Sequence, residues 1–342
     1  MTAPPPLAVV TGATGFLGSH IADRLLLRGA RVRASVRPTS DLRWLRDKPV
    51  ETVVADLASA ADTQRLLRGA RWLVHCAGVV AARDEEGYRR GNVDTTRALL
   101  AAAAQTDGIE AVVLISSLAA AGPAPLAAPQ VESAPCRPIS AYGRSKVAAE
   151  ALVNEVDWPF RTAVLRPPAL YGPRDREFLL LFRAAALGWT ARPGGSLSGL
   201  SLVHGADAAE AAVTLLATPT ARGVYFVDDG GDDATGPVAA QRRHRWGHDP
   251  QELTAALAQV LRRRVRTVPL PVAPLRWASA LLGERARRWP LLNPDRLTDL
   301  TAPGWVCSGE RLLRETEFRP RFQLAGGLQD TLDFYRGARW MT

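Results

Sequence analysis

The sequence predicts an α/β fold: a Rossmann-type doubly wound parallel sheet with a smaller, mostly helical C-terminal subdomain. Over residues 1–160, short runs rich in Val, Leu and Ile alternate with longer helical patterns. Strands that are apolar along their whole length are typical of a parallel sheet with helices on both faces. A glycine-rich turn directly follows the first of these runs, where such sheets bind the phosphates of a dinucleotide.

Strand and helix patterns alternate regularly in this N-terminal part. Six runs have the composition of buried strands, and they lie at 7–12, 31–37, 51–56, 71–78, 111–117 and 161–167. Helical patterns fall between them at 16–28, 60–69, 91–106 and 141–156. Gly29 stands directly after the first helix, where a glycine commonly ends a helix. This order predicts a chain of βα units.

The pattern is looser beyond residue 167. A helix at 206–217 and a strand at 223–229 predict a return of the chain to the sheet. Residues 230–250 are rich in Gly, Asp and Arg and predict a flexible insertion, and 251–342 read as helices with short connections. We therefore expect a dinucleotide-binding domain over 1–167, joined by 201–229, and a substrate-binding subdomain made of 168–200 and 230–342.

Composition excludes several classes of protein. No apolar run approaches the roughly 18 residues of a membrane-spanning helix, and the N-terminal residues lack the basic and apolar regions of a secretion signal. The cysteines Cys76, Cys136 and Cys307 are too widely spaced to predict a zinc site or a disulfide framework. We expect a cytoplasmic protein.

The net charge of +9 is carried almost entirely by arginine, since Lys48 and Lys146 are the two lysines of the chain. The densest arginine clusters lie at 241–248, 261–266 and 283–289, outside any nucleic-acid-binding motif. We expect no nucleic-acid partner and assign the charge mainly to solvated helix surfaces. Binding to an anionic ligand or to a membrane surface stays open as an alternative.

The segment VVTGATGFLGSH places Gly12, Gly15 and Gly18 between a buried strand and a helix. Glycine lets the backbone turn tightly and approach a pyrophosphate, and the helix N-terminus supplies unpaired N–H groups and a positive dipole. The strand–turn–helix context makes the motif more specific than glycine spacing alone. We therefore predict a dinucleotide site at this turn.

The second strand indicates which dinucleotide binds. An NAD site usually ends this strand with Asp or Glu, which accepts a hydrogen bond from the ribose 2′-OH. Here Val36 stands near that position and Arg37 follows it. An arginine fork suits a 2′-phosphate, and the hydroxyls of Thr39 and Ser40 are further donors. The sequence therefore favours NADP(H) and leaves NAD(H) open.

Tyr142 and Lys146 are four residues apart in a predicted helix, so their side chains share one face. Ser116 and Ser117 end a buried strand, at the edge where a doubly wound sheet builds its site. A phenol can exchange a proton with a substrate oxygen, an ammonium lowers the pKa of that phenol, and a hydroxyl stabilises charge on the oxygen. These residues predict acid–base catalysis beside a nicotinamide.

Taken in order, these motifs resemble the extended short-chain dehydrogenases/reductases of the NAD-dependent epimerase/dehydratase family. The resemblance covers nearly the whole chain, except about 230–245. It implies that Ser117, Tyr142 and Lys146 are catalytic. Ser117 is preferred because it precedes Gly122 by five residues, as in the S-x-x-x-x-G pattern of the family.

Other segments extend the resemblance. YRRGNVDTTRALL matches the N-V-x-G-T helix start and implies a catalytic or cofactor-side role for Asn92, although Thr95 replaces the usual Gly. LSLVHGADAAEA matches V-H-V-D-D-L-A at His204 and Asp207, which we interpret as structural, but not at Gly205. The cofactor-binding positions implied by the resemblance are Gly12, Thr14, Gly15, Phe16, Leu17, Gly18, Arg37, Asp56, Leu57, Ala77, Gly78, Tyr142, Lys146, Pro167 and Pro168.

Two branches of this family compete for the substrate. Dihydroflavonol-reductase-like and 3β-hydroxysteroid-dehydrogenase-like enzymes act on apolar ketones or alcohols, whereas nucleotide-sugar epimerases and dehydratases tend to retain NAD. The sugar-nucleotide enzymes often carry Asn where LRPPALYGP has Ala169. Apolar segments at 123–130, 178–189 and 272–283 also favour an apolar small molecule, although ordinary helix packing explains the last two equally well.

Three further alternatives concern the whole protein. A non-catalytic dinucleotide sensor would have no need of an acid–base tyrosine. A metal site from Asp228, Asp229, His244 and His248 has no recognised ligand spacing, and we expect none. The resemblance implies a homodimer formed through a bundle of the 91–106 and 141–156 helices.

Overall fold

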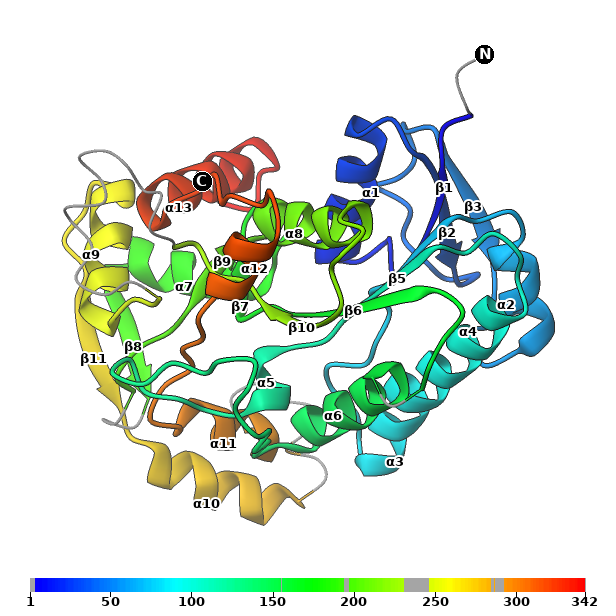
Figure 1. Cartoon of the computed structure of the whole chain (residues 1–342). Helices are drawn as coiled ribbons and strands as arrows, with labels where there is room; N and C mark the ends of the chain where they lie inside the picture. Colours follow the sequence, from blue (N-terminus) through cyan, green and yellow to red (C-terminus); the bar gives the residue numbers. More distant parts are fainter. Residues whose placement is uncertain are drawn as a thin grey trace.

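A seven-stranded parallel sheet forms the centre of the computed structural model, which describes residues 4–154, 156–193, 197–230, 246–283, 286 and 292–341 (Figure 1). The strand order is β10-β6-β5-β4-β1-β2-β3, which is the doubly wound arrangement. The strands are β1 (Leu7–Thr11), β2 (Arg31–Val36), β3 (Val50–Val54), β4 (Trp72–His75), β5 (Ala111–Ile115), β6 (Arg161–Arg166) and β10 (Gly223–Phe226). The predicted fold class is confirmed.

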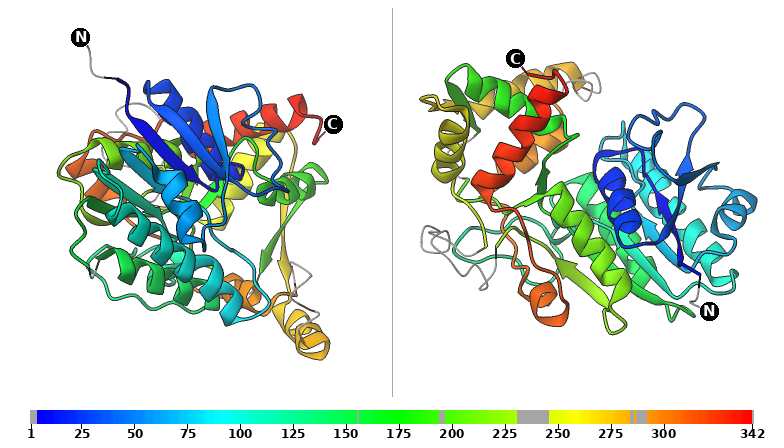
Figure 2. Two further views of the ribbon diagram at one scale, coloured as in Figure 1. Left: turned by 90° about the vertical axis from the view of Figure 1, so that its right-hand side faces the viewer. Right: turned by 90° about the horizontal axis from the view of Figure 1, so that it is seen from above.

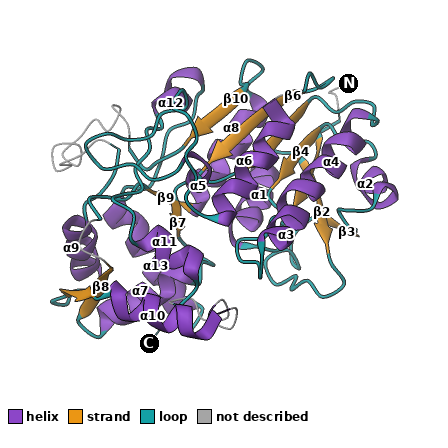
Figure 3. Cartoon of the chain, turned by 90° about the horizontal axis from the view of Figure 1, so that it is seen from below, coloured by secondary structure: helices purple, strands orange, loops and turns teal. Residues whose placement is uncertain are grey.

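Helices cover both faces of this sheet. One face packs against α1 (Phe16–Leu27) and α8 (Gly205–Ala217), and the other against α2 (Ala60–Leu67), α4 (Thr95–Ala104) and α6 (Ala141–Asn154) (Figures 1 and 3). Helix α8 is rich in alanine, and its Ala208, Ala209, Ala211 and Ala212 have no exposed surface. These small side chains let α8 lie close against the sheet and α1, which explains the strongly apolar pattern of this helix.

The register of the strands brings the predicted motifs to one edge of the sheet. Thr11 of β1 lies opposite His75 of β4, and Ile115 of β5 lies opposite Leu165 of β6. The glycine turn, the residues after β4 that include Ala77 and Gly78, and the Ser116–Ser117 pair therefore leave the sheet side by side. The order reverses between β1 and β4, which is where open α/β sheets bind ligands.

The C-terminal residues form a second body beside this edge (Figure 2). Its core consists of buried side chains from α7 (Glu177–Ala186), α9 (Pro250–Leu261) and α13 (Leu324–Gly337). Two small parallel ribbons accompany it: β7 (Ala169–Tyr171) with β9 (Leu202–His204), and β8 (Trp189–Pro193) with β11 (Arg266–Leu270). The other helices here are α10 (Val272–Leu282) and α11 (Pro294–Leu300). Helix α12 (Glu310–Glu315) packs instead at the edge of the main sheet, where its Leu312 joins the core shared with α1 and α8.

The structure corrects the predicted secondary structure in the ribbon strands and in the helix at 91–106. The short ribbon strands were not expected, and β11 interrupts a region read as helices only. The predicted helix at 91–106 is divided: α3 (Glu85–Tyr88) leads into a π-helix, η1 (Arg89–Asp94), before α4 begins. Helix α5 (Leu118–Ala121) is a single turn between β5 and the following loop.

None of the helices in the described part of the chain is long and apolar enough to cross a membrane.

Candidate active site

The glycine turn after β1 is packed too tightly for side chains. Gly12 has φ +70°, and a Cβ there would lie 2.8 Å from the backbone nitrogen of Ala77. A Cβ on Gly18 would lie 2.1 Å from the carbonyl oxygen of Gly12. Gly15 is the N-cap of α1 and has no side chain to cap the helix, and the first turn, Phe-Leu-Gly-Ser, carries no negative charge. A pyrophosphate fits this site, because the N–H groups of α1 stay available to it.

The segment after β4 joins the glycine turn to the predicted catalytic residues. The Ala77 N–H donates to the Thr11 hydroxyl at 3.1 Å. A Cβ on Gly78 would lie 2.9 Å from Asn92 Oδ1 and 3.4 Å from Lys146 Nζ. Gly78 is therefore the point where the cofactor wall, Asn92 and Lys146 approach one another.

The buried His75, at the end of β4, holds the start of this loop in place through both ring nitrogens. His75 Nδ1 lies 2.7 Å from the Thr11 hydroxyl, and its Nε2 lies 3.0 Å from the Thr96 hydroxyl. Thr96 donates to the carbonyl of Asn92 at 2.6 Å, so it accepts from a protonated Nε2. Burial lowers the pKa of His75 to about 3. The ring is therefore neutral at physiological pH and links β1 and β4 to the first turn of α4, where Thr96 holds the Asn92 carbonyl of η1.

Asn92 lies in η1 and is fully engaged by the protein. Its Oδ1 accepts from the Val79 N–H at 2.7 Å, and its Nδ2 donates to the Val79 carbonyl at 3.0 Å and to the Ser145 hydroxyl at 2.8 Å. Ser145 precedes Lys146 in α6 and donates in turn to the Tyr142 carbonyl at 2.7 Å. Asn92 thus holds the loop after β4 against the helix that carries Tyr142 and Lys146.

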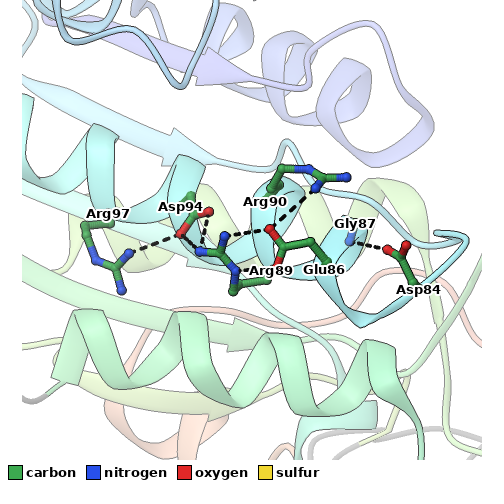
Figure 4. A network of polar contacts seen from close by, with 7 residues as sticks. All are labelled: Asp84, Glu86, Gly87, Arg89, Arg90, Asp94 and Arg97. Atoms are coloured by element: carbon green, nitrogen blue, oxygen red, sulfur yellow. Dashed lines mark hydrogen bonds and ion pairs between the residues drawn. The ribbon is translucent and has the colours of Figure 1, made fainter.

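Exposed ion pairs brace this π-helical turn (Figure 4). Arg89 donates to both oxygens of Asp94, at 2.8 and 2.9 Å, and also to Glu86 at 2.6 and 2.7 Å. Arg97 donates to Asp94 at 3.1 Å. The hydroxyl of Thr95, where the family has Gly, donates to the carbonyl of Gly91 at 2.8 Å. Single exposed pairs contribute little, but this network spans the junction of η1 with α3 and α4.

Tyr142 and Ser117 lie near each other at the carboxyl edge of the sheet, close enough for Ser117 to influence the pKa of Tyr142. Burial raises the pKa of Tyr142 to about 12, and a hydrogen bond with Ser117 acts in the opposite direction. Ser117 is the N-cap of α5, where its hydroxyl accepts from the Ala119 N–H at 3.1 Å. Gly122 ends this turn at φ +95°, and a Cβ there would lie 2.1 Å from the Arg137 carbonyl. The spacing from Ser117 to Gly122 therefore has a steric cause.

Lys146 lies beneath the tyrosine ring. Its Nζ is 5.9 Å from the centroid of the Tyr142 ring and donates to the Ile115 carbonyl at 2.9 Å. Burial lowers the pKa of Lys146 itself. The sequence analysis expected the ammonium to lower the pKa of Tyr142. In this structure burial of the phenol is the largest influence and raises that pKa, and the effect of the ammonium on Tyr142 stays a prediction.

Ser116 belongs to a different cluster, on the buried side of β5. It donates to Glu150, which also accepts from Arg166 Nε at 2.9 Å. Arg166 extends to the Cys136 sulfur at 2.9 Å. Glu150 and Arg166 are both almost completely buried, so each charge depends on the other. The sequence analysis missed this pair; the signal was two opposite charges in otherwise apolar patterns, one turn after Lys146 and at the end of β6.

Arg37 lies at the end of β2 and is exposed. Its backbone N–H donates to the Ser40 hydroxyl at 2.9 Å, which closes the turn after the strand. Within the described residues, its guanidinium has no ion-pair partner. Arg37 is therefore available to an anion at the rim of the site.

The remaining predicted cofactor positions lie along the same edge. Asp56 is exposed, and its Oδ1 accepts from the Ala58 N–H at 3.0 Å. Leu57 is half-buried against the core under α2 and α4. The Pro167 carbonyl accepts from the Leu118 N–H at 2.9 Å, which ties the loop after β6 to α5. The last predicted cofactor positions are Thr14, Phe16 and Leu17 near the glycine turn and Pro168 in the loop after β6. Leu17 and Pro168 are buried.

His204 and Asp207 have the contacts of structural residues. The His204 ring packs against that of Phe322, with ring centroids 4.0 Å apart and planes tilted by 32°. Asp207 accepts from the N–H groups of Arg321 and Phe322 at 3.0 and 2.9 Å. Close packing against α1 explains why this chain has Gly205 at a position where it departs from the family motif. A Cβ there would lie 2.7 Å from the ring of Phe16 in the first turn of α1.

The acidic pair near the insertion has structural partners. Asp229 faces His248 Nε2 at 2.9 Å, and Asp228 accepts from the Gly309 N–H at 2.8 Å. His244 and most of the predicted insertion lie outside the described residues. No group of three or more potential ligands suited to a metal ion occurs among the residues that the structure describes.

Comparison with known proteins agrees with this geometry. Residues 8–227 match the NAD dependent epimerase/dehydratase family. The chain is 31% identical over 338 residues to a ceramide reductase of Caulobacter vibrioides, covering 98% of this chain and 96% of the relative. It is 28% identical over 347 residues to the 4-hydroxy-2-methyl-3-oxo-4-farnesyl-3,4-dihydroquinoline-1-oxide ketoreductase of Stigmatella aurantiaca, covering 96% and 95%.

Among solved structures, the UDP-glucose 4-epimerase of Thermus thermophilus in complex with NAD superimposes with a TM-score of 0.74 at 23% identity. The match covers 97% of this chain and 99% of the epimerase. At this identity the likeness concerns the fold. The family match, the full-length relatives and the site geometry agree: the chain belongs to the NAD-dependent epimerase/dehydratase family of extended short-chain dehydrogenases/reductases and is an NAD(P)-dependent oxidoreductase.

Proposed function

We propose that this protein is an NADP(H)-dependent oxidoreductase that interconverts a ketone and a secondary alcohol on a fairly apolar small molecule. The observation that carries the proposal is the position of Tyr142 over Lys146, which lies against the Gly78 wall of the cofactor site. Ser117 is near enough to Tyr142 to lower its pKa. These are the groups that carbonyl reduction needs around a substrate oxygen.

In this proposal Tyr142 is the acid of the reductive direction. A neutral phenol gives its proton to the carbonyl oxygen, and the raised pKa keeps that proton in place at neutral pH. The Ser117 hydroxyl orients the same oxygen and stabilises the charge that develops on it. When bound, the reduced nicotinamide supplies the hydride, and with it the two electrons, to the carbonyl carbon. The Lys146 ammonium, held by the Ile115 carbonyl, binds the ribose hydroxyls of the cofactor.

Arg37 supports NADP(H) as the preferred cofactor. It follows β2 at the rim of the site, with its guanidinium available, and a planar arginine fork suits a phosphate. In place of the acidic residue typical of an NAD site, the strand ends with Val36. We propose that Arg37 binds the 2′-phosphate.

The names of the two relatives support an apolar substrate. One is named for a ceramide and the other for a ketone that bears a farnesyl group. We propose that the subdomain over 168–200 and 230–342 holds the apolar part of the substrate, and that 1–167 with 201–229 holds the cofactor. A homodimer through α4 and α6 is a further proposal, which sedimentation velocity would test.

A nucleotide-sugar epimerase that uses NAD is the second candidate, supported by the fold of the Thermus enzyme. Ala169, which is exposed in β7, opposes it, since the sugar-nucleotide enzymes that this sequence resembles often carry Asn there. Incubation with UDP-glucose and NAD, followed by chromatography of the sugars, separates the two candidates. Conversion of the sugar would replace the ketone reductase proposal.

The test of the proposal is Tyr142→Phe, which removes one hydroxyl. We expect reduction of apolar ketones by NADPH to fall by about 10²–10⁴-fold, the usual contribution of a positioned acid, while NADPH binding stays unchanged. Tyr88→Phe is the matched control, because the Tyr88 ring lies 6.2 Å from that of Tyr142 and has no assigned role in proton transfer. A Tyr142→Phe variant with full turnover would remove the proposed acid. A wild type that binds NADPH and reduces none of the ketones would favour a sensor.

A further inference from the structure

Helix α10 exposes its largest apolar side chains to solvent. Trp277 and Leu281 are 74% and 82% exposed, and they share one face of the helix because they are four residues apart. The opposite side is anchored: Ser279 is buried, and Arg276 donates to the Thr301 hydroxyl at 3.0 Å. Ordinary packing, which the sequence analysis considered for this segment, does not explain the exposed face.

The chain around α10 is strongly basic. Residues 262–288 contain eight arginines and a single glutamate. The excess of positive charge in this stretch is most of the net charge of +9. In the part of this stretch that the structure describes, Arg262, Arg263, Arg264 and Arg266 are exposed at the start of β11, which leads directly into α10. An apolar face with arginines at its flanks is the composition of a helix that lies in a membrane interface.

The position of α10 in the molecule suits such a role. The helix lies at the outer edge of the protein, at the end of β11, where it projects from the C-terminal body (Figures 1 and 2). The exposed side chains continue onto the ribbon before it, where Trp189 of β8 and Val268 of β11 are 43% and 48% exposed. With 11 residues, α10 is far too short to span a bilayer, but it is long enough to lie along one.

A pocket of about 700 Å³ lies directly beside α10. Arg276, Ser279 and Ala280 of α10 line it, together with Leu297 of α11 and the residues 83–85 that follow β4. Figures 1 and 3 show α11 between α10 and α5, the helical turn that begins after Ser117. Helix α11 therefore lies between α10 and the candidate site.

We propose that α10 docks this protein on an anionic lipid surface, with Trp277 and Leu281 inserted among the headgroups and the neighbouring arginines on the lipid phosphates. A second copy of the chain fits this face less well, because two segments of the same positive charge repel each other. Docking also brings the pocket to the lipid, a route for apolar ketones that rests on the proposed function. The docking itself does not depend on it.

The test is sedimentation of the purified full-length chain with vesicles, without cofactor or substrate. Vesicles of phosphatidylcholine with about one third phosphatidylglycerol provide an anionic surface of the kind that attracts basic segments, and pure phosphatidylcholine is the comparison. We expect binding to the anionic vesicles that weakens with salt, and at least a tenfold loss in Trp277→Ser/Leu281→Ser. Arg266→Gln should weaken binding about fivefold, the effect of one exposed basic residue at the surface.

Leu27→Ser is the matched control, since Leu27 is 76% exposed at the end of α1, on the other side of the molecule (Figure 1). It should bind as the wild type does. Quenching of tryptophan fluorescence by brominated lipids, lost with Trp277, gives a second reading that does not depend on the double variant folding. Equal binding of the wild type and the α10 variants, no preference for anionic vesicles, or a dimer in sedimentation velocity that Trp277→Ser dissociates would each overturn the proposal. Because no turnover is measured, failure here leaves the reductase proposal standing.

Discussion

Ser116 and Ser117 are adjacent in sequence but face different surroundings. Ser117 lies near Tyr142 at the carboxyl edge of the sheet, whereas Ser116 is 4% exposed and donates to Glu150. Strand geometry gives the reason, since successive side chains at the end of β5 point to opposite sides. The sequence alone could choose between them through the spacing to Gly122, and the structure supplies the steric basis of that spacing.

This difference predicts that the two serine-to-alanine substitutions affect different properties, one mainly kcat and the other mainly the free energy of unfolding. Ser117→Ala should lower kcat for ketone reduction by about 10²–10³-fold, the usual loss of one oxyanion donor. It should also lower the free energy of unfolding by about 0.5–2 kcal/mol, because the same hydroxyl is the N-cap of α5. Ser116→Ala should lower the free energy of unfolding by about 1.5–3 kcal/mol, because it removes a hydrogen bond to a charged group, with a much smaller effect on kcat. Steady-state kinetics and urea unfolding of both variants test this. Equal effects on kcat would contradict the assignment of Ser117.

At the scale of single elements, α6 is held by charges that its amphipathic pattern does not reveal. Glu150 lies one turn after Lys146 and pairs with Arg166 of β6, and both side chains are 4% exposed. The pair therefore fixes the helix that carries Tyr142 and Lys146 against the sheet. Sequence periodicity predicted α6 and β6 but not this pairing, because it depends on which residues the register brings together.

Glu150→Gln should be strongly destabilising. It leaves the Arg166 charge buried without a partner, a change that typically costs about 3–5 kcal/mol. Replacing both residues, as in Glu150→Leu/Arg166→Met, should recover most of the loss, since no unpaired charge remains. Urea unfolding of the two variants measures this. If the single variant is as stable as the wild type, the pair does not anchor α6.

The π-helical turn η1 marks the limit of prediction at this scale. The pattern at 91–106 predicted a continuous helix, and Asn92 was assigned a catalytic or cofactor-side role. The structure places Asn92 between Val79 and Ser145, with its amide groups satisfied by the protein. One extra residue in a helical turn leaves the hydrophobic period almost unchanged, so composition could not reveal it. The strands of the seven-stranded sheet were predicted, because their apolar runs are short and bounded by glycine and polar residues, whereas the short ribbon strands were not.

For the molecule as a whole, two buried histidines link stability to pH. Burial lowers the pKa of His75 to about 3 and that of His20 to about 4, from an ordinary 6.5. The unfolded chain therefore takes up protons below pH 6.5 that the folded protein does not. Stability from these groups is complete above pH 6.5 and is lost as the pH falls towards 4 and then 3.

Each histidine should contribute a slope of about 1.4 kcal/mol per pH unit in this range. We expect the free energy of unfolding to be about 4 kcal/mol lower at pH 5 than at pH 7 from the two together. In His75→Gln the slope between pH 6 and 5 should fall by about half, whatever the starting stability of the variant. Urea unfolding at several pH values measures it. An unchanged slope would show that His75 has the same pKa in the folded protein as in the unfolded chain.

The arrangement of the whole molecule was only partly predictable. The doubly wound sheet follows from the order of strands and helices, and the cofactor edge follows from the glycine turn. The exposed face of α10 does not, because apolar residues at helical spacing predict burial and nothing in the sequence shows which face lacks a neighbour.

Calorimetric titration with NADPH and, separately, with NADH tests the central claim most directly, because it needs no knowledge of the substrate. We expect the wild type to prefer NADPH, and Arg37→Gln to lose about 10–100-fold in affinity for NADPH alone, the value of one or two charge-assisted hydrogen bonds. Arg43→Gln, a nearby exposed arginine already paired with Asp41, should behave as the wild type. Preference for NADH, or NADPH binding that is the same in Arg37→Gln, would contradict the account and favour the NAD-using epimerase.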